Sequence, residues 1–202
     1  MYLPYSPFWL QWLYPGLIWH KSRKEKSIYL TFDDGPIPVV TPFVLNALKS
    51  FNAKATFFCI GDNIQKHPEI YQQILADGHS VGNHTYNHLK GWETGDPIYL
   101  ENVEKCNKLV SSTLFRPPYG RAKKSQYSIL STKYSVVMWD VLSGDFDTKI
   151  SPQKCLQNVM HHTRNGSIIV FHDSLKAFPR LETVLPEALA QLSKKGFQFL
   201  SL

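Results

Sequence analysis

Cysteine is scarce in this chain: three occur among 202 residues, and none belongs to a C-x-x-C pair. A small and odd number of thiols argues against a fold stapled by disulfide bonds. Cys59, Cys106 and Cys155 all fall in segments that we expect to be strand or helix. We therefore expect buried free thiols that pack as small apolar side chains, which fits a reducing compartment.

Charged side chains are absent from residues 1–19, where seven aromatic residues are found instead. A signal peptide needs a basic n-region, an aliphatic run and a small-residue cleavage site, and this stretch has none of the three. A membrane-spanning helix needs about 20 consecutive apolar residues. Pro4, Pro7 and Pro15 break such a run. The stretch is therefore predicted to be neither a leader nor a transmembrane segment.

Two interpretations remain for residues 1–26, which we name the aromatic arm. The arm is either a non-helical segment packed over the end of the domain, or an interfacial membrane contact. In the second case Trp and Tyr side chains lie at headgroup level, and a basic cluster at Lys21, Arg23, Lys24 and Lys26 faces anionic lipid. The expected location is then cytoplasmic or peripheral at the cytoplasmic membrane face, with a monomer as the default state.

The overall charge is mildly basic, with a formal net charge of +6 and a pI of about 9.1. Such an excess favours anionic partners. No helix-turn-helix, zinc-finger or RNA-stacking motif accompanies it, so nucleic acid is not expected as a partner. Hydrophobic residues make up 43% and charged residues 19%, which is ordinary for a soluble globular domain.

After residue 26, apolar runs and amphipathic segments alternate about seven times without a repeat or a linker. The predicted strands are 27–32, 55–60, 80–84, 114–116, 135–139, 167–171 and 197–200; the predicted helices are 41–51 with Thr41 as N-cap, 68–78, 99–110, 151–162 and 184–195. This alternation predicts one α/β domain over residues 27–202, a (β/α) barrel of about seven strands, closed or nearly closed. Polar clusters follow the strands, at the edge where barrels carry their chemistry.

The first polar cluster is Asp33 and Asp34, directly after an apolar strand. Such a pair is commonly a turn or a helix cap. Two adjacent carboxylates can also divide a reaction between them, one binding a metal and the other taking a proton from water.

His84 and His88 are four residues apart, which on a helical turn places both imidazoles on one face. Surface histidine pairs are common, so the spacing alone is weak evidence for a metal site. Two neutral imidazoles with one carboxylate would leave coordination positions open, as catalytic metal sites do.

Two more clusters follow later strands. The run Arg116 to Gly120 is a rigid turn that could hold Arg116 against a carboxylate and present a backbone N–H to an oxyanion. Pro118 has no N–H, so the donor would be Tyr119 or beyond. His172 ends another strand and is either a packed core residue or a general acid. Four carboxylates could orient it: Asp140, Asp145, Asp147 and Asp173.

Taken in order, TFDDGP (31–36), HTYNH (84–88), RPPYG (116–120) and VFHD (170–173) resemble the motifs of polysaccharide deacetylases, carbohydrate esterase family 4 or the NodB-homology group. The resemblance covers about residues 27 to 202 and leaves out the aromatic arm. It implies a distorted (β/α) barrel and the metal-dependent removal of an N-acetyl group from an N-acetylated carbohydrate.

The resemblance also implies roles for individual residues. Asp33 is the general base, oriented by Arg116, and Asp145 holds the general acid His172. Asp34, His84 and His88 bind a divalent ion, usually zinc and sometimes cobalt, nickel or manganese. The Tyr119 N–H helps to bind the oxyanion.

Two positions depart from the family pattern. Phe146 stands after Asp145 where the family often has Trp, so a wall of the substrate groove differs. Val170 stands where the family usually has a Leu that lines the acyl-methyl pocket, so that pocket is expected to be slightly larger. Two other functions stay open: action on a lipid-linked amino sugar at a membrane face, by deacetylation or deformylation, and a non-catalytic glycan-binding domain.

Overall fold

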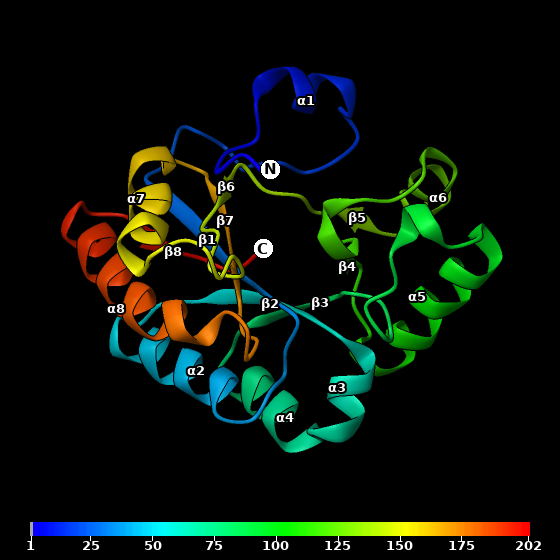
Figure 1. The fold of residues 1–202 in the computed structure, drawn as a ribbon, viewed down its shortest axis with the longest axis horizontal. Coiled ribbons are helices and arrows are strands. Elements are labelled where there is room, and N and C mark those ends of the chain that lie inside the picture. Colours follow the sequence, from blue (N-terminus) through cyan, green and yellow to red (C-terminus); the bar gives the residue numbers. More distant parts are fainter. Residues whose placement is uncertain (1) are drawn as a thin grey trace.

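The computed structural model describes residues 2–202, which form one curled parallel sheet covered by helices (Figure 1). The strands are β1 (Ser27–Asp33), β2 (Ala55–Cys59), β3 (Ser80–Asn83), β4 (Leu114–Phe115), β5 (Ser135–Val136), β6 (Val141–Leu142), β7 (Ile168–His172) and β8 (Gln198–Phe199). Their order is β5-β4-β3-β2-β1-β7-β6, with β8 paired to the start of β1. Every named pair is parallel. The predicted α/β barrel of about seven strands is confirmed, in a curled form that does not close between β5 and β6.

Helices follow most of the strands and lie outside the sheet. They are α1 (Phe8–Leu13), α2 (Val40–Ser50), α3 (Gly61–Lys66), α4 (Pro68–Ala76), α5 (Asp96–Val110), α6 (Lys124–Leu130), α7 (Pro152–His162) and α8 (Phe178–Lys194), with short 3-10 turns η1 (Gly91–Glu93) and η2 (Pro118–Gly120). Helix α7 begins as predicted, because the Ser151 side chain accepts a hydrogen bond from the Lys154 N–H.

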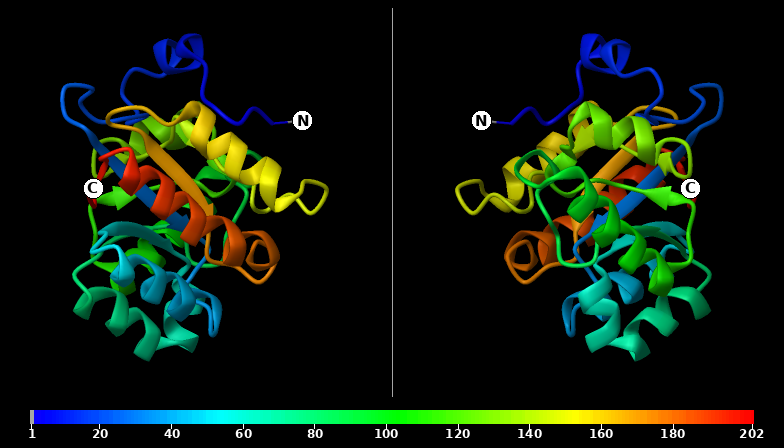
Figure 2. Two further views of the ribbon diagram at one scale, coloured as in Figure 1. Left: turned by 90° about the vertical axis from the view of Figure 1, so that its left-hand side faces the viewer. Right: turned by 90° about the vertical axis from the view of Figure 1, so that its right-hand side faces the viewer.

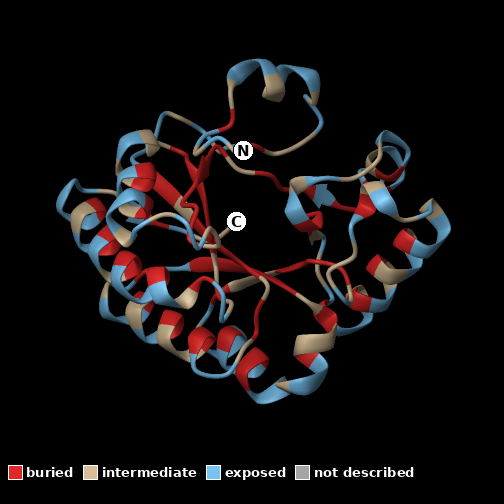
Figure 3. Cartoon of the chain, viewed as in Figure 1, coloured by how far each residue is buried: buried red, intermediate tan, exposed pale blue. Residues whose placement is uncertain are grey.

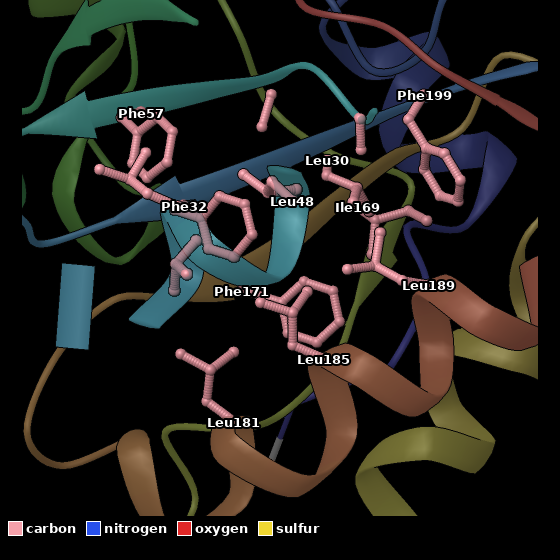
Figure 4. Packing of buried hydrophobic residues seen from close by; sticks show 14 of the residues in the cluster. Leu30, Phe32, Leu48, Phe57, Ile169, Phe171, Leu181, Leu185, Leu189 and Phe199 are labelled. Atoms are coloured by element: carbon pink, nitrogen blue, oxygen red, sulfur yellow. The ribbon is translucent and has the colours of Figure 1, made fainter. Parts of the chain in front are cut away.

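The central strands β1, β2 and β7 are buried at nearly every position, as Figure 3 shows for the middle of the sheet. Continuous burial is typical of parallel strands with both faces covered. On the helix side, the Phe32 ring stacks on those of Phe57 and Phe171, at centroid distances of 5.1 and 5.9 Å. Leucines of α8 close over these rings (Figure 4). The strand ends that carry the polar clusters therefore project from a rigid core.

Some predicted boundaries are wrong. Helix α8 begins at Phe178, six residues before the predicted Val184, and keeps Pro186 inside it. Helix α2 begins at Val40, so Thr41 is not its N-cap; the Thr41 hydroxyl instead bonds within the fold. Helices α3 and α6 and strand β6 were not predicted, because each is short and lies between polar segments. The prediction of three buried free thiols is confirmed.

The aromatic arm contains helix α1, so the prediction of a non-helical arm is wrong. Pro7 is the N-cap of this helix and Pro15 follows its end, so these prolines flank the helix rather than interrupt it. The helix stands at one end of the molecule, away from the sheet, in both views of Figure 2. Among residues 2–202, no helix has the length and apolar character needed to cross a bilayer.

Residues 136–142, which connect β5 to β6 across the open side of the barrel, anchor the arm. Leu142 N–H donates to the Pro4 carbonyl at 2.9 Å, and Met138 N–H donates to the Ile18 carbonyl at 2.7 Å. The Arg23 guanidinium pairs with the buried Asp140 carboxylate at 2.7 Å. The arm is therefore part of the folded structure, and one member of the predicted basic cluster is used to hold it.

Candidate active site

The parallel sheet brings the predicted site residues to one edge, because the carboxyl ends of parallel strands lie on the same side. Asp33 is the last residue of β1 and His172 the last of β7, and the two are direct neighbours in the register of these strands. His84 follows β3 and Arg116 follows β4. Residues that are up to 139 positions apart in the sequence, from Asp33 to His172, therefore meet above the buried core.

Asp34, His84 and His88 form a cluster whose ligand atoms all lie within 4.8 Å of one another. Asp34 Oδ1 is 3.3 Å from His88 Nε2 and 3.8 Å from His84 Nε2. The two histidines do not share a helical turn, contrary to the prediction. They belong to a loop in which Thr85 and His88 have φ values of 65° and 59°, and this loop turns both rings toward Asp34.

The donor atoms of this cluster fit a divalent metal. Nδ1 of His84 donates to the Arg116 carbonyl at 2.8 Å, which leaves Nε2 free toward Asp34. Burial lowers the pKa of His84 to about 3, so its imidazole is neutral at physiological pH. Burial also lowers the pKa of His88, although Asp34 opposes this change. Neutral imidazoles beside a carboxylate are the form in which these groups bind metal.

Asp34 is held by residues that the sequence did not single out for this purpose. The Asp173 carboxylate accepts hydrogen bonds from the Gly35 N–H at 3.0 Å and the Thr41 hydroxyl at 2.7 Å. The Asn63 amide donates to the Asp34 carbonyl at 2.7 Å. A Cβ atom at Gly35 would collide with the Asp173 carboxylate, so only glycine fits here. The sequence pattern does not predict these contacts. Gly35 is the only residue whose type could have suggested them.

Arg116 is fully buried and holds Asp33. Its Nη1 lies 2.7 Å from Asp33 Oδ1 and donates also to the Thr31 hydroxyl at 2.8 Å. The remaining donors of the guanidinium reach the carbonyls of Val137 and Met138. Each of the three guanidinium nitrogens therefore donates at least one hydrogen bond, and the predicted pairing of Arg116 with Asp33 is present in the structure.

Asp145 and His172 form the second charged pair of the site. His172 Nδ1 lies 2.7 Å from Asp145 Oδ1, and the His172 backbone N–H donates to Asp145 Oδ2 at 2.7 Å. Burial disfavours the charged imidazole, but Asp145, with further contributions from Asp34 and Asp33, raises the pKa of His172 to about 9. His172 is therefore protonated at neutral pH.

The other three carboxylates considered for this histidine do not contact it. Asp140 pairs with Arg23, Asp173 holds the Gly35 loop, and Asp147 caps its own turn by accepting from the Lys149 N–H. Asp145 alone of the four therefore orients His172.

The turn after β4 places Tyr119 beside the metal cluster. Tyr119 has a φ of 59°, and the N–H groups of Gly120 and Arg121 bond to the carbonyls of Pro117 and Pro118. The Tyr119 N–H is thus the remaining donor of this turn for a substrate oxygen, as expected from the missing N–H of Pro118. The Tyr119 ring lies 4.7 Å from that of His88.

The two positions that depart from the family pattern lie around the site. The Phe146 ring packs edge-on against His172 with a centroid distance of 5.1 Å, and so forms a wall beside it. Val170 is buried next to Thr31 in the β1–β7 register, and so shares with Thr31 the face of the sheet on which Arg116 lies. Its contact with an acyl group stays a prediction.

The sequence is similar to those of known carbohydrate deacetylases. The sequence profile of the polysaccharide deacetylase family matches residues 20–135. A peptidoglycan-N-acetylglucosamine deacetylase of Bacillus cereus is 31% identical over 191 residues, covering 91% of this chain and 90% of that protein. A chitooligosaccharide deacetylase of Azorhizobium caulinodans is 34% identical over 161 residues, covering 75% of this chain and 76% of that protein.

Solved structures show the same architecture. The crystal structure of the Bc1960 peptidoglycan N-acetylglucosamine deacetylase superposes with a TM-score of 0.89 at 29% identity, covering 98% of this chain and 95% of that one. A family 4 carbohydrate esterase from Streptomyces lividans, in complex with acetate, superposes with a TM-score of 0.76 at 28% identity, over 86% of this chain and 91% of that one. The chain therefore belongs to the polysaccharide deacetylase family, carbohydrate esterase family 4.

Proposed function

We propose that this protein hydrolyses the N-acetyl group of an N-acetylated amino sugar in a glycan or glycoconjugate, releasing acetate and leaving a free amine. One observation carries the proposal: the Arg116–Asp33 pair, the Asp34–His84–His88 cluster and the Asp145–His172 pair meet at one sheet edge. A base, a metal site and an acid in one place are what amide hydrolysis needs. The deacetylases among the relatives support the amino-sugar substrate.

The family is metal-dependent, and Asp34, His84 and His88 would hold the ion in this chain. Two imidazole nitrogens and one carboxylate oxygen suit zinc, with cobalt, nickel and manganese as the alternatives. When bound, a divalent ion polarises the amide carbonyl and acidifies a water molecule.

The protein's own groups carry the proton transfers. Asp33, fixed by Arg116, takes a proton from the attacking water, and the resulting hydroxide adds to the acyl carbon. The Tyr119 N–H donates to the oxygen that becomes negative in the tetrahedral intermediate. His172 gives its proton to the amide nitrogen, the C–N bond breaks, and the amine leaves. Asp145 keeps the imidazolium oriented with Nε2 toward the substrate.

A panel of N-acetylated substrates tests the proposed function. Chitooligosaccharides, peptidoglycan fragments and N-acetylglucosamine glycosides are assayed for acetate release after reconstitution with zinc, cobalt, nickel or manganese. We expect metal-dependent release from at least one substrate class and none after chelation. Metal-loaded protein that binds glycans but releases no acetate from any of them would instead identify a glycan-binding module.

The pH profile tests the role of His172. Because this histidine must be protonated to act as an acid, and the Asp145 carboxylate raises its pKa, the kcat of the zinc-loaded enzyme should fall only on the alkaline side of neutral pH. Asp145→Asn removes the carboxylate that raises this pKa, so the alkaline limb should move to lower pH by about one pH unit or more. The profile is measured at saturating zinc.

Asp147→Asn is the matched control, because it removes a partly exposed carboxylate two residues away that does not bond to His172. It should leave the alkaline limb of the pH profile in place. An alkaline limb at the wild-type pH in Asp145→Asn would assign the general acid to another group.

We also propose that the aromatic arm makes peripheral contact with an anionic lipid surface, at the cytoplasmic membrane face. Helix α1 buries none of its residues, and Phe8 and Trp12 are 83% and 79% exposed. Three lysines follow within one short stretch, at Lys21, Lys24 and Lys26. Exposed aromatic groups followed in the chain by a cluster of cations are the composition that favours the interface of an anionic bilayer.

Co-sedimentation with vesicles measures this contact. We expect binding to phosphatidylglycerol vesicles that weakens with salt, and little binding to phosphatidylcholine vesicles, because each lysine near an anionic surface contributes about 1 kcal/mol. The double variant Phe8→Ser/Trp12→Ser should lower the bound fraction roughly tenfold, since it removes the two most exposed aromatic side chains of α1.

Ile98→Ser, which removes an exposed apolar side chain on the distant helix α5, is the control and should bind as the wild type does. Equal binding by the double variant and the control would contradict the proposal.

A further inference from the structure

A cleft of about 570 Å³ lies between the aromatic arm and the barrel, and its lining is largely apolar. We name it the arm cleft. Its walls include Tyr2, Trp9 and Leu10 of the arm and Trp92, Trp139 and Leu142 of the barrel. The volume lies in the range typical of small-ligand sites, about 300–1,000 Å³. The proposed reaction uses none of these side chains.

Two aromatic contacts connect the arm cleft to opposite sides of the proposed catalytic centre. On one side Trp92 packs edge-on against Tyr119, at 5.4 Å between centroids, and Tyr119 lies against His88. On the other side Tyr2 packs on Phe146 at 5.0 Å, and Phe146 packs on His172. On both sides of the proposed catalytic centre, a residue that lines the cleft is therefore separated from a site histidine by a single aromatic ring.

Two polar side chains of the arm cleft are bonded to the protein itself. Ser6 Oγ donates to the Trp139 carbonyl at 2.6 Å, and Trp19 Nε1 donates to the Tyr14 carbonyl at 3.2 Å. Among the lining residues that the structure describes, Arg121 is the only charged one, and its guanidinium lies over the Trp92 ring. The cleft thus offers little charge and much apolar surface for a hydrocarbon chain.

We propose that the arm cleft binds the apolar aglycone of the substrate, a hydrocarbon chain attached to the N-acetylated amino sugar, so that the enzyme acts on a glycolipid. The inference rests on the proposed deacetylase function and specifies its substrate class. Residues 2–19, the uncharged part of the arm, supply one wall, and the segment 136–142 that anchors the arm contributes to the other. A free sugar or a polar glycan end would leave this apolar surface exposed to water, whereas a hydrocarbon chain would cover it.

Two glycosides with one headgroup test the proposal: octyl and methyl 2-acetamido-2-deoxy-β-glucopyranoside, both below the micelle concentration of the octyl compound. Acetate release by the zinc-loaded full chain gives kcat/KM for each. We expect a preference for the octyl glycoside of at least about tenfold, because several methylene groups leave water on binding.

Two tryptophans of helix α1 form a matched pair of variants. Trp9 lines the arm cleft, whereas Trp12 is not part of its lining and is 79% exposed. Trp9→Ser should reduce the octyl preference at least about threefold while leaving kcat/KM for the methyl glycoside within about twofold of wild type. Trp12→Ser should change neither value, since no vesicle is present. Leu10→Trp, which fills the cleft, provides a second variant and should also lower the octyl preference.

The outcomes separate the inference from the function on which it rests. Equal kcat/KM for the two glycosides in the wild type, or equal losses in Trp9→Ser and Trp12→Ser, would overturn the aglycone site while the deacetylase function stands. If no substrate releases acetate, the deacetylase function fails, and the cleft is then judged by quenching of tryptophan fluorescence with a bromoalkyl glycoside. Quenching that Trp9→Ser weakens would support the cleft as a hydrocarbon site, and no quenching would overturn it.

Discussion

Asp33→Asn is expected to lower kcat by roughly 10³- to 10⁴-fold while zinc content stays at the wild-type level. The asparagine keeps the shape of the side chain and can still accept a hydrogen bond from Arg116, which lies 2.7 Å from Asp33 Oδ1. It cannot take a proton from water. Because Asp34 and the two histidines are untouched, the metal cluster persists, and the loss isolates the chemical step.

Acetate release under single-turnover conditions measures the rate, and metal analysis after gel filtration measures zinc. Asp34→Asn provides the contrast, since it should lose metal as well as activity. Asp62→Asn on the surface of α3 is the neutral control. A near-normal rate in Asp33→Asn would remove Asp33 from the role of general base.

Arg116→Met should cause the largest loss of stability of any single change in the site, roughly 3–5 kcal/mol. Methionine fills much of the same volume but leaves the Asp33 carboxylate buried without its partner. It also leaves the Val137 and Met138 carbonyls without the donors of the guanidinium. For a chain of this size the change corresponds to a fall in Tm of roughly 10 °C.

A double-mutant cycle shows whether the buried charge is the cause. Adding Asp33→Asn to Arg116→Met removes the orphaned carboxylate, so the double variant should be more stable than Arg116→Met alone. Free energies of unfolding from chemical denaturation are compared for the four proteins. Strict additivity of the two changes would mean that Arg116 acts by packing on Phe58, over whose ring its guanidinium lies at 4.1 Å, rather than by pairing.

The sequence predicted much of the fold because its signals are local. Apolar runs such as Ile168 to Phe171 need no distant partner to be read as strands, and their regular alternation with helices leaves few topologies. The site residues were singled out because each of Asp33, His84, Arg116 and His172 lies at or directly after a strand end. Their roles were predicted only from the resemblance of the ordered motifs to those of polysaccharide deacetylases.

What the sequence did not predict depends on contacts across the chain. The roles of Thr41, Asn63 and Asp173 around the Gly35 loop rest on hydrogen bonds between residues as far as 138 positions apart. The helical-turn interpretation of His84 and His88 was wrong because residue spacing does not reveal positive φ angles at non-glycine residues. The aromatic arm was predicted to be non-helical because proline was counted as a breaker at positions where it can also border a helix.

The direct pairing of Asp33 and His172 in the ladder between β1 and β7 has an evolutionary consequence. The distance between the two groups proposed to move protons is set by main-chain hydrogen bonds between two buried strands. The surfaces proposed to contact the rest of the substrate, including Phe146, Tyr119 and the aromatic arm, belong to loops and to the N-terminal segment, which can lengthen, shorten or exchange side chains. Substrate specificity can therefore change among proteins that inherit this fold, while the relative position of Asp33 and His172 is kept.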